Sequence, residues 1–437
     1  MNPIAVGIIG MVILIALLFM GLHVGITMML IGFFGYAYIV HTQGAIGMLK
    51  GVLYSTGSNY SLSVIPMFVL MGHFAYYSGL SKELYNVAYK WLGRLPGGLA
   101  VATIGACGFF AAICGSSTAT AATFGTVTLP EMKRYKYHNS LATGSIAAGG
   151  TLGILIPPSV GFILYGIISG QSIGRLFAAG FLPGFLLAFC FITVIIFQVK
   201  RNPALAPEIE KSSFREKMIA LGGVVPVLVI FIFVIGGMFG GLFTANEASA
   251  VGAIGAFIYL IIKKQASFEN IKKALEATVK TTAMIFLILI GAYAFGYFLA
   301  ITTIPTALAS FISGLDVNRY VILIAILIFY ALLGCIMDSL AMVLLTVPIF
   351  FPVISGLGFD PIWYGVLMVM VMEMGLITPP VGMNLYIIKG VAGDEIGIKE
   401  IIQGAFPHVI AMMVAVIIVV IFPIIALALP NLFYGSV

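Results

Sequence analysis

The stretch Gly153-Ile154-Leu155-Ile156-Pro157-Pro158 has a near copy later in the chain, Gly375-Leu376-Ile377-Thr378-Pro379-Pro380. Each copy lies inside an apolar segment, at residues 140–168 and 361–390, that is long enough to cross a lipid bilayer as a helix. Proline has no N–H group and clashes with the preceding helical turn, so each Pro-Pro pair is expected to break its helix within the apolar segment. The interpretation of the rest of the chain follows from these two broken helices.

The composition is that of an integral membrane protein. Of the 437 residues, 61% are hydrophobic and only 8% are charged, whereas soluble domains carry about 25% charged residues. Apolar runs of about 20 residues recur along the chain, and the absence of long apolar–polar alternation argues against a β-barrel. We therefore expect an all-α polytopic membrane protein, with spans at about 4–20, 24–40, 61–79, 140–168, 175–198, 218–236, 242–263, 279–300, 361–390 and 403–430.

Two further apolar segments, at about 98–129 and 319–352, are interrupted near the middle by small or polar residues. The interruptions are Gly115-Ser116-Ser117-Thr118 and Gly334-Cys335-Ile336-Met337-Asp338-Ser339. A helix break leaves backbone groups that lipid cannot satisfy, so such a segment has to be enclosed by protein or line a ligand site. We interpret both segments as re-entrant helical hairpins, which enter and leave the membrane on one side.

The basic residues support this topology. With both hairpins counted as re-entrant, 18 of the 21 lysine and arginine residues border one side of the membrane, and only Lys50, Arg175 and Arg319 fall on the other. Positive charge marks the cytoplasmic side, so both chain ends are predicted to be periplasmic. The net charge of +6 could suggest a nucleic-acid partner, but the basic residues punctuate apolar runs instead.

The repeated motifs predict two structural repeats, at 1–217 and 218–437. The Pro-Pro motifs, the hairpin breaks, and the pair Thr128-Leu129-Pro130 and Thr346-Val347-Pro348 each recur in the second half at a nearly constant offset. The first hairpin is expected to enter from the cytoplasm and the second from outside. Repeats of opposite orientation are typical of secondary transporters, which expose one site to each side in turn.

The helix breaks also predict where ligands bind. The carbonyl groups before the proline pairs are free to coordinate a cation, and half-helix N-termini at the hairpin tips suit carboxylates. Each hydroxyl taken alone could equally bond a helix backbone. We expect two cation sites, formed by Gly115, Ser116, Gly149, Gly153, Ile156, Gly334, Asp338, Gly375, Thr378 and Pro379. Substrate contacts are expected from Ser116, Ser117, Thr118, Thr120, Ser339 and Thr378.

Three carboxylates differ in their sequence context. A charged residue such as Asp338 at membrane depth costs about 2.5–3.5 kcal/mol on insertion scales, so it should have a partner, and a bound cation would serve. Glu373 is either a second cation ligand or a structural carboxyl, and the sequence leaves both open. Glu247 follows Thr244 at the spacing of a helix-capping box, which favours a structural role.

The long motifs resemble those of one transporter family, over essentially the whole chain. Residues 115–122 with Thr128-Leu129-Pro130-Glu131-Met132 resemble the first-hairpin region in the large membrane subunit of TRAP (tripartite ATP-independent periplasmic) transporters, and residues 147–159 and 375–385 are similar to other regions of that subunit. In the family a proline often follows the first serine pair, where this chain has Thr118. Within the last motif, Asn384 becomes a further substrate-binding candidate.

The resemblance implies a sodium-coupled importer of the elevator type, located in the bacterial or archaeal inner membrane. Its expected partners are a separate small four-helix membrane subunit and a periplasmic binding protein that delivers an organic acid, such as a C4-dicarboxylate or a sialic acid. The expected coupling ion is Na⁺, with no other cofactor. The substrate itself is not identified by the sequence.

Other functions are less well supported by the sequence. A stand-alone sodium–dicarboxylate symporter of the same superfamily would share the hairpins but need no binding protein. An intramembrane enzyme should show a nucleophile–base pair, and a channel would not need the inverted hairpins. The chain has no GxxxxGK[ST] or HExxH motif, so we expect neither ATP hydrolysis nor a transition-metal site.

Overall fold

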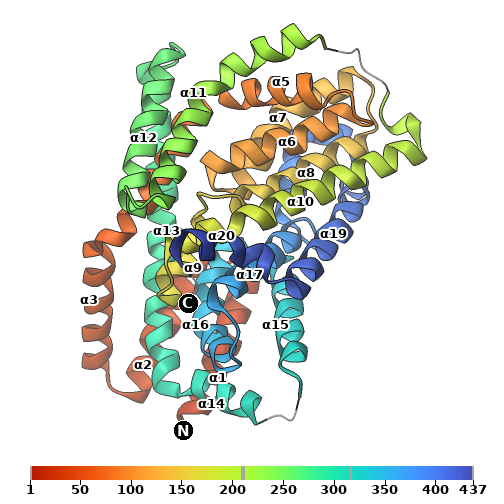
Figure 1. Ribbon diagram of the computed structural model, residues 1–437. Helices are drawn as coiled ribbons and strands as arrows, with labels where there is room; N and C mark the ends of the chain where they lie inside the picture. Colours follow the sequence, from red (N-terminus) through yellow and green to blue (C-terminus); the bar gives the residue numbers. More distant parts are fainter. Residues whose placement is uncertain (1, 208–211, 315–316, 436–437) are drawn as a thin grey trace.

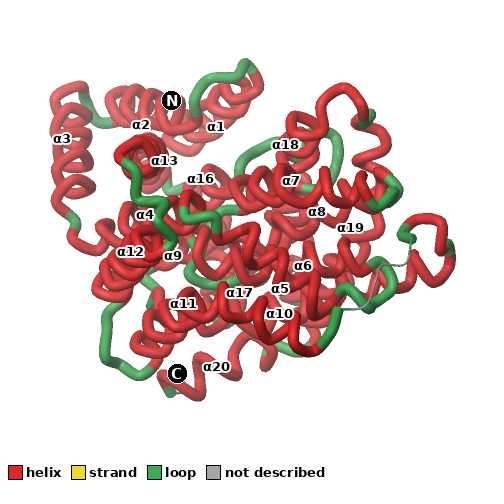
Figure 2. The backbone as a smooth tube through the Cα atoms, turned by 90° about the horizontal axis from the view of Figure 1, so that it is seen from above, coloured by secondary structure: helices red, strands yellow, loops and turns green. Residues whose placement is uncertain are grey.

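The computed structural model describes residues 2–207, 212–314 and 317–435, and Lys211, one of the basic residues counted above, lies outside them. The described chain is helical throughout, without strands (Figures 1 and 2). The first half contains α1 (Pro3–Phe19), α2 (Val24–Ile39), α3 (Thr42–Ser58), α4 (Val64–Tyr77), α5 (Leu80–Leu92), α6 (Gly98–Cys114), α7 (Ser117–Arg134), α8 (Asn139–Leu155), α9 (Val160–Ser169) and α10 (Ile173–Arg201).

The second half has a similar order of helices. It contains α11 (Phe214–Phe239), α12 (Ala245–Ile262), α13 (Phe268–Thr302), α14 (Ile304–Ser313), α15 (Arg319–Gly334), α16 (Ser339–Gly356), α17 (Pro361–Leu376), α18 (Met383–Ala392), α19 (Ile398–Ile421) and α20 (Ile424–Tyr434). Short 3-10 helices cover Tyr60–Ser63, Pro203–Leu205 and Gly393–Glu395.

The prediction of an all-α polytopic membrane protein is confirmed. Within the described residues, seven helices are long and apolar enough to cross a membrane. The segments Tyr60–Tyr77 and Leu80–Leu92 form a further apolar pair, bent by 69°. Gly79 lies at this bend with φ +81°, a left-handed conformation that favours glycine.

Capping side chains set the start of many helices. Ser159 and Ser172 accept hydrogen bonds from the first turns of α9 and α10, and Asp360 does the same for α17. These residues supply an acceptor for backbone N–H groups that have no partner within the helix. Both Pro-Pro pairs lie between helices, after α8 and after α17, as the sequence predicted.

The prediction of one span at 403–430 is wrong. α19 ends at Ile421 and α20 begins at Ile424, with Pro423 between them. The apolar composition continues across the break, so hydropathy alone did not reveal it. The predicted span at 279–300 is longer than expected, because α13 already begins at Phe268, where Ser267 caps it.

The helix packing brings each hairpin against one of the two broken helices. α2 packs along α13, and α4 packs along α12, while α3 lies at the edge against α2 and α13 (Figures 1 and 2). The first hairpin, α6 and α7, packs on α8, and the second, α15 and α16, packs on α17. The first helix break, at Pro157 and Pro158, is buried, whereas Pro379 and Pro380 of the second are exposed.

Candidate functional site

The first hairpin tip is the turn between α6 and α7. α6 ends at Cys114, and Gly115 then adopts a left-handed conformation (φ +62°) that favours glycine. Ser116 caps α7, because its hydroxyl accepts a hydrogen bond from the N–H of Ala119 at 3.3 Å. The Thr120 hydroxyl donates to the carbonyl oxygen of Ser116 at 2.7 Å. Thr120 therefore serves the backbone of the tip itself.

The second tip is the turn between α15 and α16. α15 ends at Gly334, and Asp338 caps α16 by accepting a hydrogen bond from the N–H of Leu340 at 3.0 Å. The carbonyl oxygen of Cys335 accepts a hydrogen bond from the N–H of Gly382 at 3.0 Å, which ties this tip to the second helix break. Asp338 thus caps a helix at the position where the cation site was predicted.

The caps give the register between the two tips. Ser116 and Asp338 hold equivalent positions, and their separation in the sequence equals that between Pro157 and Pro379. The sequence comparison instead paired Gly115 with Gly334, whose separation is shorter. The second tip therefore contains additional residues between the end of its first helix and its cap.

Each tip packs against the helix that precedes a Pro-Pro pair. A Cβ atom on Gly153 of α8 would overlap the carbonyl oxygen of Ser116, and one on Gly375 of α17 would overlap the backbone of Gly334. Glycine at these two positions allows backbone-to-backbone contact between tip and broken helix. The structure thus brings together one pair of residues from each predicted cation site, Ser116 with Gly153 and Gly334 with Gly375, whereas Gly149 faces Cys107 and Ile104 of α6.

Glu373 of α17 connects the two tips. Its carboxylate accepts one hydrogen bond from the hydroxyl of Ser117, in the first turn of α7. It accepts a second from the hydroxyl of Ser339, in the first turn of α16, at 3.0 Å. Glu373 is fully buried. This contact supports the structural alternative for Glu373 and adds a feature that the sequence did not reveal, namely one carboxylate shared by both hairpins.

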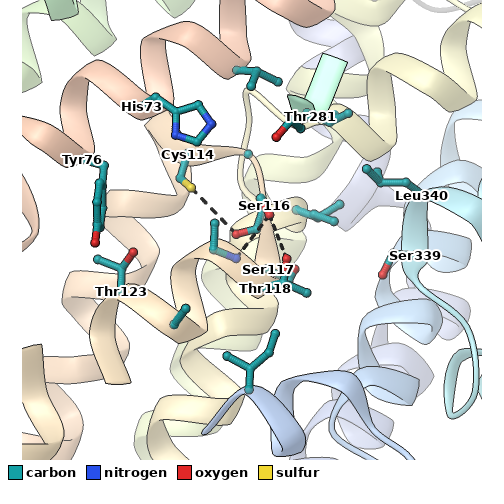
Figure 3. Close-up of a pocket in the computed structure, with 18 of the residues that line it drawn as sticks. His73, Tyr76, Cys114, Ser116, Ser117, Thr118, Thr123, Thr281, Ser339 and Leu340 are labelled. Carbon is teal, nitrogen blue, oxygen red and sulfur yellow. Dashed lines mark hydrogen bonds between the residues drawn. The ribbon is translucent and has the colours of Figure 1, made fainter. Parts of the chain in front are cut away.

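A cavity of about 550 Å³, which we call the central cavity, lies beside these contacts. Figure 3 shows Ser116 and Thr118 of the first tip on the same cavity as Ser339 of the second tip. The volume is in the range of small-molecule sites. Six of the predicted residues line it: Gly115, Ser116, Ser117, Thr118, Asp338 and Ser339.

The other predicted residues are not among those that line the cavity: Thr120, Gly149, Gly153, Ile156, Gly334, Gly375, Thr378, Pro379 and Asn384. The Thr378 hydroxyl donates to the carbonyl oxygen of Met374 at 2.6 Å. Asn384 is buried, and its amide nitrogen donates to the carbonyl oxygen of Ala147 at 3.4 Å, while its amide oxygen has no hydrogen-bond partner among the described residues.

Sequence reasoning missed the residues that α4 and α13 contribute. His73 and Tyr76 of α4 and Thr281 of α13 line the central cavity, as does Thr123 of α7 (Figure 3). None of them lies in a repeated motif, and only a three-dimensional arrangement brings α4 and α13 to the hairpin tips. Among the residues that the structure describes, no lysine or arginine lines the cavity. An anion there would meet the N-terminal end of α7, which carries partial positive charge and has a neutral cap.

The expectation for Glu247 is confirmed. Its carboxylate accepts a hydrogen bond from the N–H of Thr244 at 2.8 Å, and the Thr244 hydroxyl accepts one from the N–H of Glu247 at 3.3 Å. This reciprocal pair is a capping box at the start of α12. Glu247 is not among the residues of the central cavity.

Comparison with known proteins identifies the family. Residues 11–425 match the family described as "Tripartite ATP-independent periplasmic transporter, DctM component". The chain belongs to this family. The DctM-family permease is 37% identical to the C4-dicarboxylate TRAP transporter large permease protein DctM of Pseudomonas aeruginosa, over 87% of this chain and 88% of that protein. It is 32% identical to the sialic acid TRAP transporter large permease protein SiaM of Vibrio cholerae, over 96% of this chain and 97% of that protein.

Solved structures of transporters share the fold. The Alcanivorax borkumensis YdaH transporter superposes with a TM-score of 0.60 at 15% identity, covering 87% of this chain and 90% of that one. Neisseria gonorrhoeae MtrF superposes with a TM-score of 0.61 at 14% identity, covering 89% and 85%. The permease is therefore a multi-span membrane component of a TRAP transporter, and a transport protein rather than an enzyme.

Proposed function

We propose that this permease imports an organic acid across the bacterial or archaeal inner membrane, driven by a sodium gradient. The acid is delivered by a periplasmic binding protein, and a small four-helix membrane subunit completes the transporter. Substrates named for the relatives, C4-dicarboxylates and sialic acids, define the class to be tested first. Both chain ends are proposed to be periplasmic, from the distribution of basic residues.

The observation that carries the proposal is the meeting of two capped hairpin tips beside one cavity. The tips are joined by Glu373, through Ser117 and Ser339. Each tip exposes the start of a helix, and the central cavity has room for a small organic acid. In the first tip the hydroxyls of Ser116 and Thr118 lie 3.3 Å apart, close enough to hold one carboxylate together with N–H groups of α7.

Two sodium ions are proposed to bind where each tip touches its broken helix. The first site would use Ser116 with the α8 backbone from Gly149 to Ile156. The second would use Asp338 and Gly334 with the α17 backbone near Gly375 and Thr378. A cation beside Asp338 would reduce the cost of a buried carboxylate. It would also stiffen both tips, so that sodium binding prepares the substrate site.

The two inverted repeats that the sequence predicts would suit an elevator-type mechanism. Both hairpins and both broken helices would move together against a frame that contains α2, α4, α12 and α13. The frame helices pack in pairs, α2 with α13 and α4 with α12. A site held between repeats of opposite orientation could then face each side of the membrane in turn.

Uptake into proteoliposomes tests the proposal. The permease is reconstituted with its small subunit, and radiolabelled succinate or sialic acid is supplied with the cognate binding protein under an inward sodium gradient. We expect accumulation above the external concentration without ATP. Equal uptake when potassium replaces sodium would contradict sodium coupling, and proton coupling would then be tested with an imposed pH gradient.

The same vesicles separate this function from the stand-alone symporter. Omitting the binding protein should abolish uptake of the acid at low concentration if the transporter is tripartite. Undiminished uptake without the binding protein would instead favour a symporter that binds its substrate directly from solution.

A further inference from the structure

A second cavity, of about 540 Å³, lies between α5 and α7, and we call it the α5–α7 cavity. It is bordered by segments 80–97 and 130–139, which the basic residues assign to the cytoplasmic side. Its lining includes one lysine, one asparagine, one glutamate and three tyrosines: Lys82, Asn86, Glu131, Tyr85, Tyr89 and Tyr135. Nothing in the proposed transport site accounts for these residues.

The two cavities are adjacent along α7. Thr126 lines both the central cavity and the α5–α7 cavity. Thr123, one turn earlier on α7, lines the central cavity, and Pro130, one turn later, lines the α5–α7 cavity. A polar solute that left the hairpin tips along this face of α7 would therefore pass Thr126 and enter the second cavity.

The Tyr85 hydroxyl is an independent sign of a ligand. The Tyr85 side chain is only 7% exposed, yet its hydroxyl has no hydrogen-bond partner among the described residues. A buried hydroxyl without a partner is costly. A solute or water in the α5–α7 cavity could supply the missing partner.

The charges favour an anion on the α5 side of the cavity. Lys82 is exposed and makes no ion pair with any described residue, whereas Lys90 of the same helix pairs with Glu216 at 3.4 Å. Lys82 and Asn86 are four residues apart and so share one face of α5. Glu131 lines the opposite wall, on α7, and disfavours an anion there. Of the other nearby charges, Glu83 is paired with Lys263.

We propose that the α5–α7 cavity is a release station, where Lys82, Tyr85 and Asn86 hold the carboxylate of the substrate after it leaves the hairpin tips for the cytoplasm. The station rests on the proposed function, since it assumes that the cargo is an organic acid. It acts only on the cytoplasmic side. Its loss changes how the substrate leaves or rebinds from that side and leaves loading from the periplasm intact.

Charged thiol reagents test the anion preference without knowledge of the substrate. Asn86→Cys is labelled in inside-out vesicles with anionic 2-sulfonatoethyl methanethiosulfonate and with its cationic trimethylammonium analogue, and modification of that peptide is followed by mass spectrometry. We expect Lys82→Gln to lower the anionic-to-cationic rate ratio by about fivefold, from the loss of one nearby charge. Lys50→Gln, in α3 and outside the α5–α7 cavity, is the control and should leave the ratio unchanged. An unchanged ratio in Lys82→Gln overturns the proposal.

Side-specific transport tests the role in release. The radiolabelled acid that supports wild-type uptake is measured from each face by counterflow. We expect Lys82→Gln and Tyr85→Phe to raise the half-saturating concentration at the cytoplasmic face about three- to fivefold, with the periplasmic value unchanged. Because no described residue hydrogen-bonds the Tyr85 hydroxyl, Tyr85→Phe should not lower stability, so this change would report ligand binding.

The outcomes separate the station from the transport function itself. Equal changes at both faces, or none at either, overturn the station while wild-type uptake stands. A wild type that takes up none of the acids contradicts the proposed function, and the labelling ratio still decides whether the cavity attracts anions.

Discussion

Glu373 is the residue whose replacement tests the architecture of the site most directly. Its carboxylate accepts hydrogen bonds from Ser117 and Ser339, which belong to different hairpins. Hydrogen bonds between membrane helices contribute about 0.6 kcal/mol on average and at most about 1.7 kcal/mol. Glu373→Ala removes both bonds, so we expect the free energy of unfolding to fall by about 1 to 3 kcal/mol.

Glu373→Gln separates the hydrogen bonds from the charge. The glutamine side chain has nearly the same shape, and it can accept a hydrogen bond from one serine while donating to the hydroxyl oxygen of the other. We expect the free energy of unfolding of this variant to be close to that of the wild type. If Glu373 only joins the tips, Glu373→Gln should also keep sodium-dependent uptake, whereas a cation ligand should lose apparent sodium affinity when its charge is removed.

The assay is reversible unfolding in mixed detergent micelles, combined with a double-mutant cycle. Ser339→Ala is measured in the wild-type background and in Glu373→Ala. Ser339→Ala should lower the free energy of unfolding by less in the Glu373→Ala background than in the wild type, because the hydrogen-bond partner of Ser339 is already absent there. The reasoning is refuted if Glu373→Ala is as stable as wild type, or if the two substitutions are additive.

Three further predictions concern the tips. Asp338→Asn should raise the sodium concentration for half-maximal uptake far more than Glu247→Gln, because Asp338 lines the central cavity and Glu247 belongs to a capping box. Sodium titration of uptake measures both values, and equal increases in the two variants would contradict the prediction. Ser116→Ala should lower apparent sodium affinity and Thr378→Ala should do the same, each by about threefold; an unchanged titration for either would exclude that residue from a cation site. Gly375→Ala should lower the free energy of unfolding by about 1–3 kcal/mol through overlap with the second tip, as measured by detergent unfolding; a stability equal to wild type would show that the contact relaxes freely.

The helix breaks were predictable because their signals are local. A Pro-Pro pair interrupts a helix wherever it occurs, and Ser116 and Asp338 are residue types that cap helices. Both lie where apolar segments are interrupted, so composition and capping pointed to the same positions. The break at Pro423 shows the limit of this reasoning, because one proline within a long apolar run is compatible with either a kinked or an interrupted helix.

The contacts between distant segments were not predictable in the same way. Ser117 and Glu373 are 256 residues apart, and no sequence pattern states which carboxyl lies near which hydroxyl. His73 and Thr281 reach the central cavity from helices outside the repeated motifs. The sequence does contain one signal that favours Glu373 as a contact residue. A carboxyl in the middle of an apolar helix needs hydrogen-bond donors, and the serines of the two hairpin tips are donors of the required kind.

The symmetry of the backbone contrasts with the asymmetry of the charges. The caps of the two tips are Ser116 and Asp338, so one tip is neutral where the other carries a carboxyl. At the offset that relates these two caps, Glu373 corresponds to Thr151, whose hydroxyl donates to the carbonyl oxygen of Ala148 at 2.6 Å within its own helix. Asp338 and Glu373 therefore both lie in the second of the two predicted repeats.

This asymmetry predicts where opposite charges bind. The start of α7 presents partial positive charge with a neutral cap, which suits the carboxylate of an organic acid. The start of α16 is already capped by Asp338, so a second anion there would be repelled while a cation would be attracted. Two tips related by symmetry can thus serve different ligands, and Glu373 holds them together because it accepts a hydrogen bond from each.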